Sequence, residues 1–167
     1  MGVEVTSPKD DARQLRREAY NVNGKMRLPI DVFAIAKRVG IRVEPTPLRK
    51  DVAGFIIKEA DEEAPTIYVN AGDGPQRQRF TVAHELGHFM VHRDDPEIAY
   101  VDNRDELASL GTDPLERRCN AFAAELLMPE ALVKRYWAEG WKFEEMRRRF
   151  DVSKSAMITR LKHFGFI

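Results

Sequence analysis

The chain has 167 residues, of which 43% are apolar and 32% charged, so its composition indicates one ordinary globular domain and excludes a disordered chain. Lysine plus arginine (27) equals aspartate plus glutamate (27), which argues against a general nucleic-acid binder, because such proteins carry a basic excess. Cys119 is the only cysteine, which excludes an intrachain disulfide, and no apolar run is long enough to cross a membrane. We therefore expect a single cytoplasmic domain over residues 1–167.

The first half of the chain is expected to combine two helices with a small sheet. Residues 1–9 have the composition of a loose tail. Helices are expected over residues 10–21 and 30–39, each followed by a glycine that can end it. Strands are expected over residues 41–45, 52–58 and 66–70. A charged turn separates the last two strands, so we expect them to form an antiparallel hairpin.

The second half is expected to be mainly helical, with proline at or near several helix starts. Helices are expected from Gly74-Pro75 to about His92, from Asp113-Pro114 to Met128, and over residues 130–138. Residues 96–112 read as a polar, irregular connection, and residues 143–167 as two short helices broken at 150–153. The expected class is α+β, with a small antiparallel sheet of about three strands packed on the helix that begins at Pro75.

That helix contains the pattern His84-Glu85-x-x-His88. Two histidines four residues apart lie about 40° apart around a helix, one turn above the other, so both imidazoles can reach one tetrahedral zinc ion. Glu85 projects about 100° from His84, where it can act as a general base on a water at the metal without being a ligand. A helical wheel places the apolar side chains on a broad opposite arc, which is typical of a helix that lines a catalytic cleft.

A catalytic zinc site needs a third protein ligand. His92 lies about 12 Å along the helix axis from His84, which favours the role of a helix-end histidine instead. On the helix after Pro114, Glu116 falls on the inward arc and Glu125 on the outward arc, so Glu116 is the candidate ligand; the alternative is a capping box with Asp113. Asn120 is expected to hold Glu116 or a backbone group, or to be a simple buried amide.

The stretches Arg77 to His88 and Glu116 to Pro129, with the strand end Ile67 to Asn70, resemble the ImmA/IrrE family of bacterial metallopeptidases. The resemblance covers about residues 25–165. It implies that Glu116 is the third zinc ligand and that the protein is a selective cytoplasmic endopeptidase. The implied substrate is a helix-turn-helix repressor, and some members of the family resemble parts of toxin–antitoxin pairs.

The expected function is therefore a zinc-dependent endopeptidase that cleaves a specific repressor or antitoxin-like partner, with Glu85 as its base. Tyr68 and Tyr100 are candidates for stabilising the oxyanion, although packing is the favoured explanation of each. The strand Thr66 to Asn70 is a candidate edge for pairing with an extended substrate.

The main alternative is a regulatory module that binds DNA or protein through residues 143–167, keeps a zinc site and has little peptidase activity. This segment resembles a helix-turn-helix with several basic residues, among them Arg160 and Lys162. The zero net charge favours a simpler interpretation, in which the two helices close the core through Val152, Met157, Ile158 and Leu161.

Overall fold

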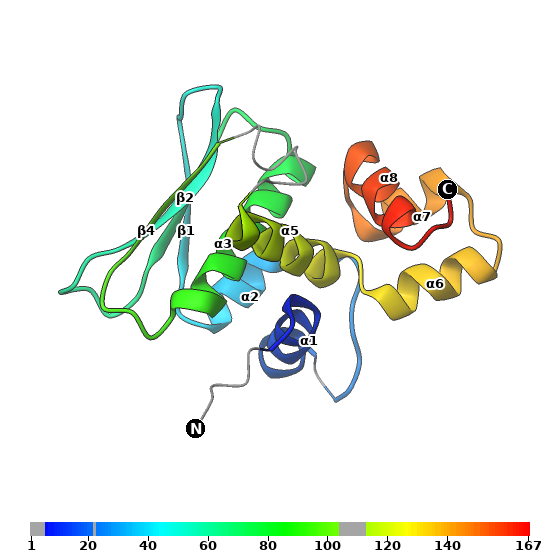
Figure 1. The fold of residues 1–167 in the computed structure, drawn as a ribbon, viewed down its shortest axis with the longest axis horizontal. Coiled ribbons are helices and arrows are strands. Elements are labelled where there is room, and N and C mark those ends of the chain that lie inside the picture. The colour runs from blue at the N-terminus through cyan, green and yellow to red at the C-terminus, as the bar shows by residue number, and fades with distance from the viewer. Residues whose placement is uncertain (1–5, 22, 104–112) are drawn as a thin grey trace.

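The computed structural model describes residues 6–21, 23–103 and 113–167, with residues 100–103 described by their backbone alone. Four strands and seven helices occur in these ranges (Figure 1). The strands are β1 Arg42–Thr46, β2 Val52–Lys58, β3 Thr66–Asn70 and β4 Ile98–Asn103. The helices are α1 Pro8–Ala19, α2 Val32–Arg38, α3 Pro75–His92, α5 Pro114–Leu127, α6 Glu130–Ala138, α7 Phe143–Phe150 and α8 Lys154–His163. The expected α+β class with a helical second half is confirmed.

The sheet has the order β1-β3-β2-β4. The expected hairpin is confirmed, since β2 and β3 are antiparallel with Ile56 opposite Ile67. The sheet differs from the expectation in being mixed and four-stranded: β1 pairs in parallel with β3, and β4 adds to the free edge of β2. The strand β4 was missed because acidic residues and a proline flank its short apolar run, so the segment reads as a polar connection.

Strand β3 lies between β1 and β2, so both of its edges are already paired. The prediction that Thr66–Asn70 offers an edge to a substrate is therefore wrong. Periodicity alone shows which residues share a strand face, whereas the order of strands in a sheet depends on long-range pairing. The edges of this sheet are β1 and β4.

The helix α3 packs across one face of the sheet, and α5 packs on α3 (Figure 1). Strand residues Ile56 and Ile67 and helix residues Val82 and Leu86 are completely buried in this layer. Pro75 begins α3 after Gly74, and the Asp113 carboxylate caps α5 by accepting a hydrogen bond from the Leu115 N–H at 2.8 Å. One continuous cluster of buried apolar side chains extends from α1 to α8.

The helices α3 and α5 approach closely because Gly87 has no side chain at their crossing. A Cβ at Gly87 would lie 3.1 Å from the Cys119 Cα and 3.2 Å from the Phe122 ring. Both distances are shorter than ordinary van der Waals contacts, so any larger residue would force the helices apart. Gly87 therefore sets the separation between the histidines of α3 and the polar residues of α5.

The C-terminal pair α7 and α8 is attached to α3 through the turn between the two helices. Asp151 ends α7 in the left-handed conformation, with φ of 51°. The buried Arg79 of α3 donates to the Asp151 and Phe150 carbonyl groups, at 3.2 and 3.3 Å, and Gln76 donates to the Asp151 carboxylate at 3.0 Å. Burial lowers the pKa of the Arg79 guanidinium, and the Asp151 carboxylate opposes that effect.

A buried charge cluster centred on Glu125 makes the second attachment. Arg16 of α1 lies 3.1 Å from one Glu125 carboxylate oxygen, and Arg160 of α8 contacts the other. Arg160 also donates to the Met128 carbonyl oxygen at 2.9 Å. The prediction that Glu125 faces water is wrong: it is 2% exposed, because α1 and α8 cover the side of α5 that the wheel left to solvent.

Two smaller expectations also change. The expected tail over residues 1–9 lies partly outside the described residues, and Ser7 already caps α1 through the Asp10 N–H. In the C-terminal pair, Val152, Met157 and Leu161 are buried as expected, whereas Ile158 is 38% exposed. In the described ranges, no helix is both long enough and apolar enough for a bilayer span.

Candidate metal centre

Three side chains of the His84-Glu85-x-x-His88 pattern are completely buried on α3. The two imidazole rings have centroids 5.0 Å apart and meet edge to face. The wheel placed them on the less apolar side of the helix, facing a cleft, and in the structure α5 lies along that side. Buried imidazoles need polar partners, and α5 supplies them.

Glu116, in the first turn of α5, faces both rings. One of its carboxylate oxygens lies 3.1 Å from the His84 Nε2, and the other lies 3.2 Å from the His88 Nε2. Two donors of a tetrahedral zinc ion with bonds of about 2.0 Å lie roughly 3.3 Å apart. The spacing of these three groups thus fits the donor set of a zinc site. Asp113 is the N-cap, as the capping-box alternative also requires, and the Glu116 carboxylate lies at the two imidazoles.

Asn120, one turn further along α5, fixes the orientation of the first imidazole. Its Oδ1 lies 2.8 Å from the His84 Nδ1, so the amide oxygen accepts the Nδ1–H hydrogen bond. This bond leaves the lone pair of the neutral ring on Nε2, which is the nitrogen that faces Glu116. The sequence indicated a supporting role for Asn120 but assigned it to Glu116 or a backbone group.

Cys119 is a donor that the sequence reasoning missed. Its buried Sγ and one ring nitrogen from each of His84 and His88 all lie within 4.8 Å of one another. A helical wheel places Cys119 on the same inward arc as Glu116, which was the available signal. A thiolate and an imidazole bound to one zinc ion lie roughly 3.6 Å apart. The Glu116 oxygens, at 3.1 and 3.2 Å from the two Nε2 atoms, match the donor spacing of a zinc site, and Cys119 is the competitor that an experiment has to separate.

The remaining candidates lie away from this centre. The His92 Nδ1 is 2.8 Å from the Asp95 carboxylate at the end of α3, as expected for a helix-end histidine. Tyr68 stacks on Phe55 at 4.8 Å between ring centroids and alternates with the buried Ile67, so it lies on the sheet face opposite α3. Its suggested oxyanion role is therefore wrong. The Tyr100 side chain lies outside the described residues.

Comparisons with known proteins agree with this geometry. Residues 36–162 match the peptidase family M78, described as the IrrE N-terminal-like domain. The chain belongs to this family. The resemblance to the ImmA/IrrE peptidases expected from the sequence is thereby confirmed.

Individual relatives of the family cover similar parts of the chain. The radiation response metalloprotease IrrE of Deinococcus radiodurans is 34% identical over 105 residues, which are 60% of this chain and 32% of that protein. The uncharacterized immunity region protein 2 of Bacillus phage phi105 is 30% identical over 62% of each chain. The metallopeptidase ImmA of Bacillus subtilis is 24% identical over 63% of this chain and 61% of its own length. The matches thus span about a third of IrrE and about three fifths of the other two.

The M78 match includes α3, α5 and the pair α7 and α8 as far as Lys162. The helices that form the candidate metal centre and those that pack beside it therefore belong to one family domain. The C-terminal pair is part of the region that the family shares.

Proposed function

We propose that this chain is a zinc-dependent endopeptidase in which His84, His88 and Glu116 bind the metal and Glu85 is the general base. The observation that carries the proposal is the position of the Glu116 carboxylate, whose two oxygens lie 3.1 and 3.2 Å from the Nε2 atoms of the histidines. Membership of the peptidase family M78 supports peptide-bond hydrolysis as the reaction at this donor set.

Each residue has a distinct task in the proposed mechanism. Zinc, when bound, activates a water and polarises the scissile carbonyl group. Glu85 takes the proton of the attacking water and delivers it to the leaving amine, which is general acid–base catalysis by one carboxylate. Asn120 holds the His84 ring in the tautomer and orientation that ligation requires. Complete burial of His84, Glu85 and His88 excludes bulk water from these side chains.

The proposed substrate is a specific protein, expected from the family resemblance to be a helix-turn-helix repressor or an antitoxin-like partner. The two relatives named for metalloprotease or metallopeptidase activity support proteolysis as the reaction class. The phage relative is named for an immunity region, which is consistent with a regulatory substrate.

Metal analysis tests the ligand set. Wild-type protein loaded with zinc and dialysed should retain about one equivalent, and His84→Ala should retain almost none. Glu116→Gln should lower zinc affinity by at least roughly tenfold, while Cys119→Ser should leave it unchanged. The reverse pattern, with loss only in the cysteine variant, would assign the third position to Cys119.

Proteolysis tests the base. Zinc-loaded wild-type protein and Glu85→Gln are each incubated with a bacterial lysate, and new protein N-termini are quantified by mass spectrometry. Glu85→Gln should retain zinc and lose cleavage by about a thousandfold or more. If both proteins retain zinc and produce the same new N-termini, Glu85 is not the base. If neither produces N-termini beyond those of the untreated lysate, the chain is the alternative, a binding module with a zinc site.

A further inference from the structure

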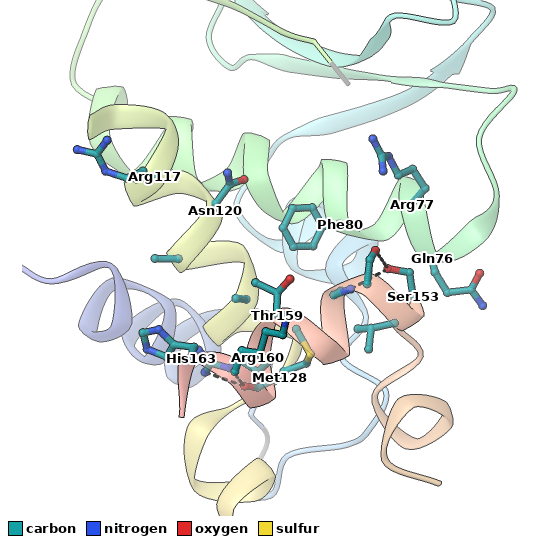
Figure 2. Close-up of a pocket in the computed structure, with 16 residues that line it drawn as sticks. Gln76, Arg77, Phe80, Arg117, Asn120, Met128, Ser153, Thr159, Arg160 and His163 are labelled. Atoms are coloured by element: carbon teal, nitrogen blue, oxygen red, sulfur yellow. Dashed lines mark hydrogen bonds between the residues drawn. The ribbon is translucent and has the colours of Figure 1, made fainter. Parts of the chain in front are cut away.

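A groove of about 770 Å³ separates the catalytic helices from the C-terminal pair (Figure 2). One wall is formed by α3 and α5, and the other by α8 and the turn that precedes it. Phe80 of α3 and Thr159 of α8 lie across from each other in this groove (Figure 2). Small and apolar side chains form much of the lining: Phe80, Ala121, Ala124, Met128, Val152 and Ala156.

The groove adjoins the candidate metal centre through Asn120. Asn120 lines it and at the same time lies 2.8 Å from the His84 Nδ1. Phe80 precedes His84 by one helical turn, and Arg117 follows Glu116. A chain segment seated in the groove would therefore lie next to the residue that orients the His84 ring.

The described part of the groove lining has basic side chains and no acidic ones, although the chain as a whole is neutral. None of the described residues that line it is an aspartate or a glutamate. On the α8 side the lining includes Lys162 and His163, whereas the Arg160 charge is compensated by Glu125. Lys162 is exposed and makes no ion pair within the described ranges. A groove with apolar side chains and cationic groups complements a segment that carries acidic and apolar side chains.

The shape of the groove favours a polypeptide over duplex DNA. A recognition helix must protrude so that it can enter the major groove, which is about 12 Å wide. Here the exposed side chains of α8 that such a helix would use, Ser155, Thr159 and Lys162, line the groove opposite α3 and α5. The face of α8 that would contact DNA thus lies opposite two other helices and does not protrude.

The groove is also held in a fixed shape. Arg160 fastens α8 to α5 through Glu125 and the Met128 carbonyl oxygen, and Gln76 and Arg79 fasten the preceding turn to α3 through Asp151. A preformed site binds without the cost of ordering its own walls.

We propose that this groove, which adjoins the metal centre, binds an acidic segment of the protein substrate that also carries apolar side chains. The proposal rests on the proposed function, because it assigns the groove to the substrate of that same centre. In this proposal the α8 wall of the groove selects the substrate. The contacts that determine selectivity then lie away from the bond that is cleaved.

The test measures binding alone, in the zinc-loaded full chain with Glu85→Gln, by fluorescence anisotropy. The probes are two fluorescein-labelled peptides of about 15 residues with one shared pattern of leucine and alanine, bearing either glutamate or lysine at the remaining positions. A labelled duplex of about 20 base pairs is the third probe. The acidic peptide should bind at least roughly tenfold more tightly than the basic peptide, and raising the salt from about 50 to 200 mM should weaken it.

Variants of α8 locate the binding site. Lys162→Glu, which reverses a charge in the groove, and Thr159→Trp, which fills it, should each weaken acidic-peptide binding by roughly tenfold. Lys154→Glu and Ile158→Trp are matched controls, because both residues are exposed on α8 but do not line the groove; their affinities should equal that of the parent.

Two results would overturn the proposal: equal affinity for the acidic and basic peptides, or groove variants that bind like their controls. Tight binding of the duplex that Thr159→Trp abolishes would assign the groove to DNA instead. Zinc retention is measured on the same samples. If the parent protein retains zinc but does not bind the acidic peptide, the groove is refuted, whereas failure of the parent to retain zinc refutes the metal centre, so the two failures are distinguishable.

Discussion

Replacing Glu125 by glutamine removes one buried negative charge and keeps the size of the side chain. The Glu125 side chain is 3% exposed, and those of its partners Arg16 and Arg160 are 6% and 8% exposed. The substitution therefore leaves two guanidinium groups buried without the carboxylate that compensates them. Burial already lowers the pKa of both arginines, and the Glu125 charge is what opposes this effect.

Breaking a buried ion pair by removing one partner costs about 3–5 kcal/mol of unfolding free energy, because the remaining charge is uncompensated. For a chain of this size each kcal/mol changes the melting temperature by about 2–4 °C. We therefore expect Glu125→Gln to melt roughly 6–20 °C below the wild type. The loss should be accompanied by weaker attachment of α1 and α8 to α5, since both helices contact the cluster.

Urea unfolding followed by circular dichroism gives the free energy, and a thermal melt gives the temperature. Glu139→Gln is the matched control, because Glu139 pairs with Arg135 at 3.7 Å on the surface, with half or more of each side chain exposed. An exposed pair of this kind contributes at most about 1 kcal/mol. If Glu125→Gln lost no more stability than Glu139→Gln, the arginines would be effectively solvated and the buried cluster would not fasten the C-terminal pair.

Three further predictions concern the crossing of α3 and α5, the histidine orientation and acid stability. Gly87→Ala should cost about 1–3 kcal/mol and weaken zinc binding measured by competition with a chelator, because the new Cβ meets α5 at 3.1 Å. Asn120→Ala should lower zinc affinity by about 10–100-fold with little change in secondary structure, since it removes the acceptor that orients the first imidazole; unchanged affinity would contradict this role. Hydrogen bonds from Lys134 and Lys9 lower the pKa of Glu130 to about 2. A carboxylate with a depressed folded-state pKa stabilises the protein above its unfolded value, so the stability difference between wild type and Glu130→Gln should be present at neutral pH and shrink as the pH falls from 4.5 towards 2.

The candidate site shows how much of a metal centre can be predicted from residue spacing along single helices. The spacing of His84 and His88 places both imidazoles on one side of a helix whatever the rest of the chain does. The same reasoning brought Glu116 inward on its own helix, and in the structure its carboxylate faces the two rings. The identity of these residues as metal ligands stays a prediction until metal is measured.

The helical wheel wrongly placed Glu125 in solvent, because a wheel considers one helix alone and assumes that only its most apolar side is buried. The helix α5 packs against both α3 and α1, and Arg160 of α8 reaches Glu125, so the position predicted to face outward lies at the centre of a buried cluster. A hint was available in the basic residues of the flanking helices, yet nothing in the local pattern says which arginine will meet which carboxylate.

The sequence by itself determined the local features of this protein: the helix with two histidines and a glutamate, the β2–β3 hairpin, the helix ends at glycine and proline, and the family. These depend on residue spacing and backbone preferences within a few turns of chain. Only the tertiary structure decided that β3 is an inner strand, that Asn120 meets His84, and that α8 faces α5 across a groove. Those features depend on contacts between segments far apart in the chain, which arise from packing the whole core rather than from any one element.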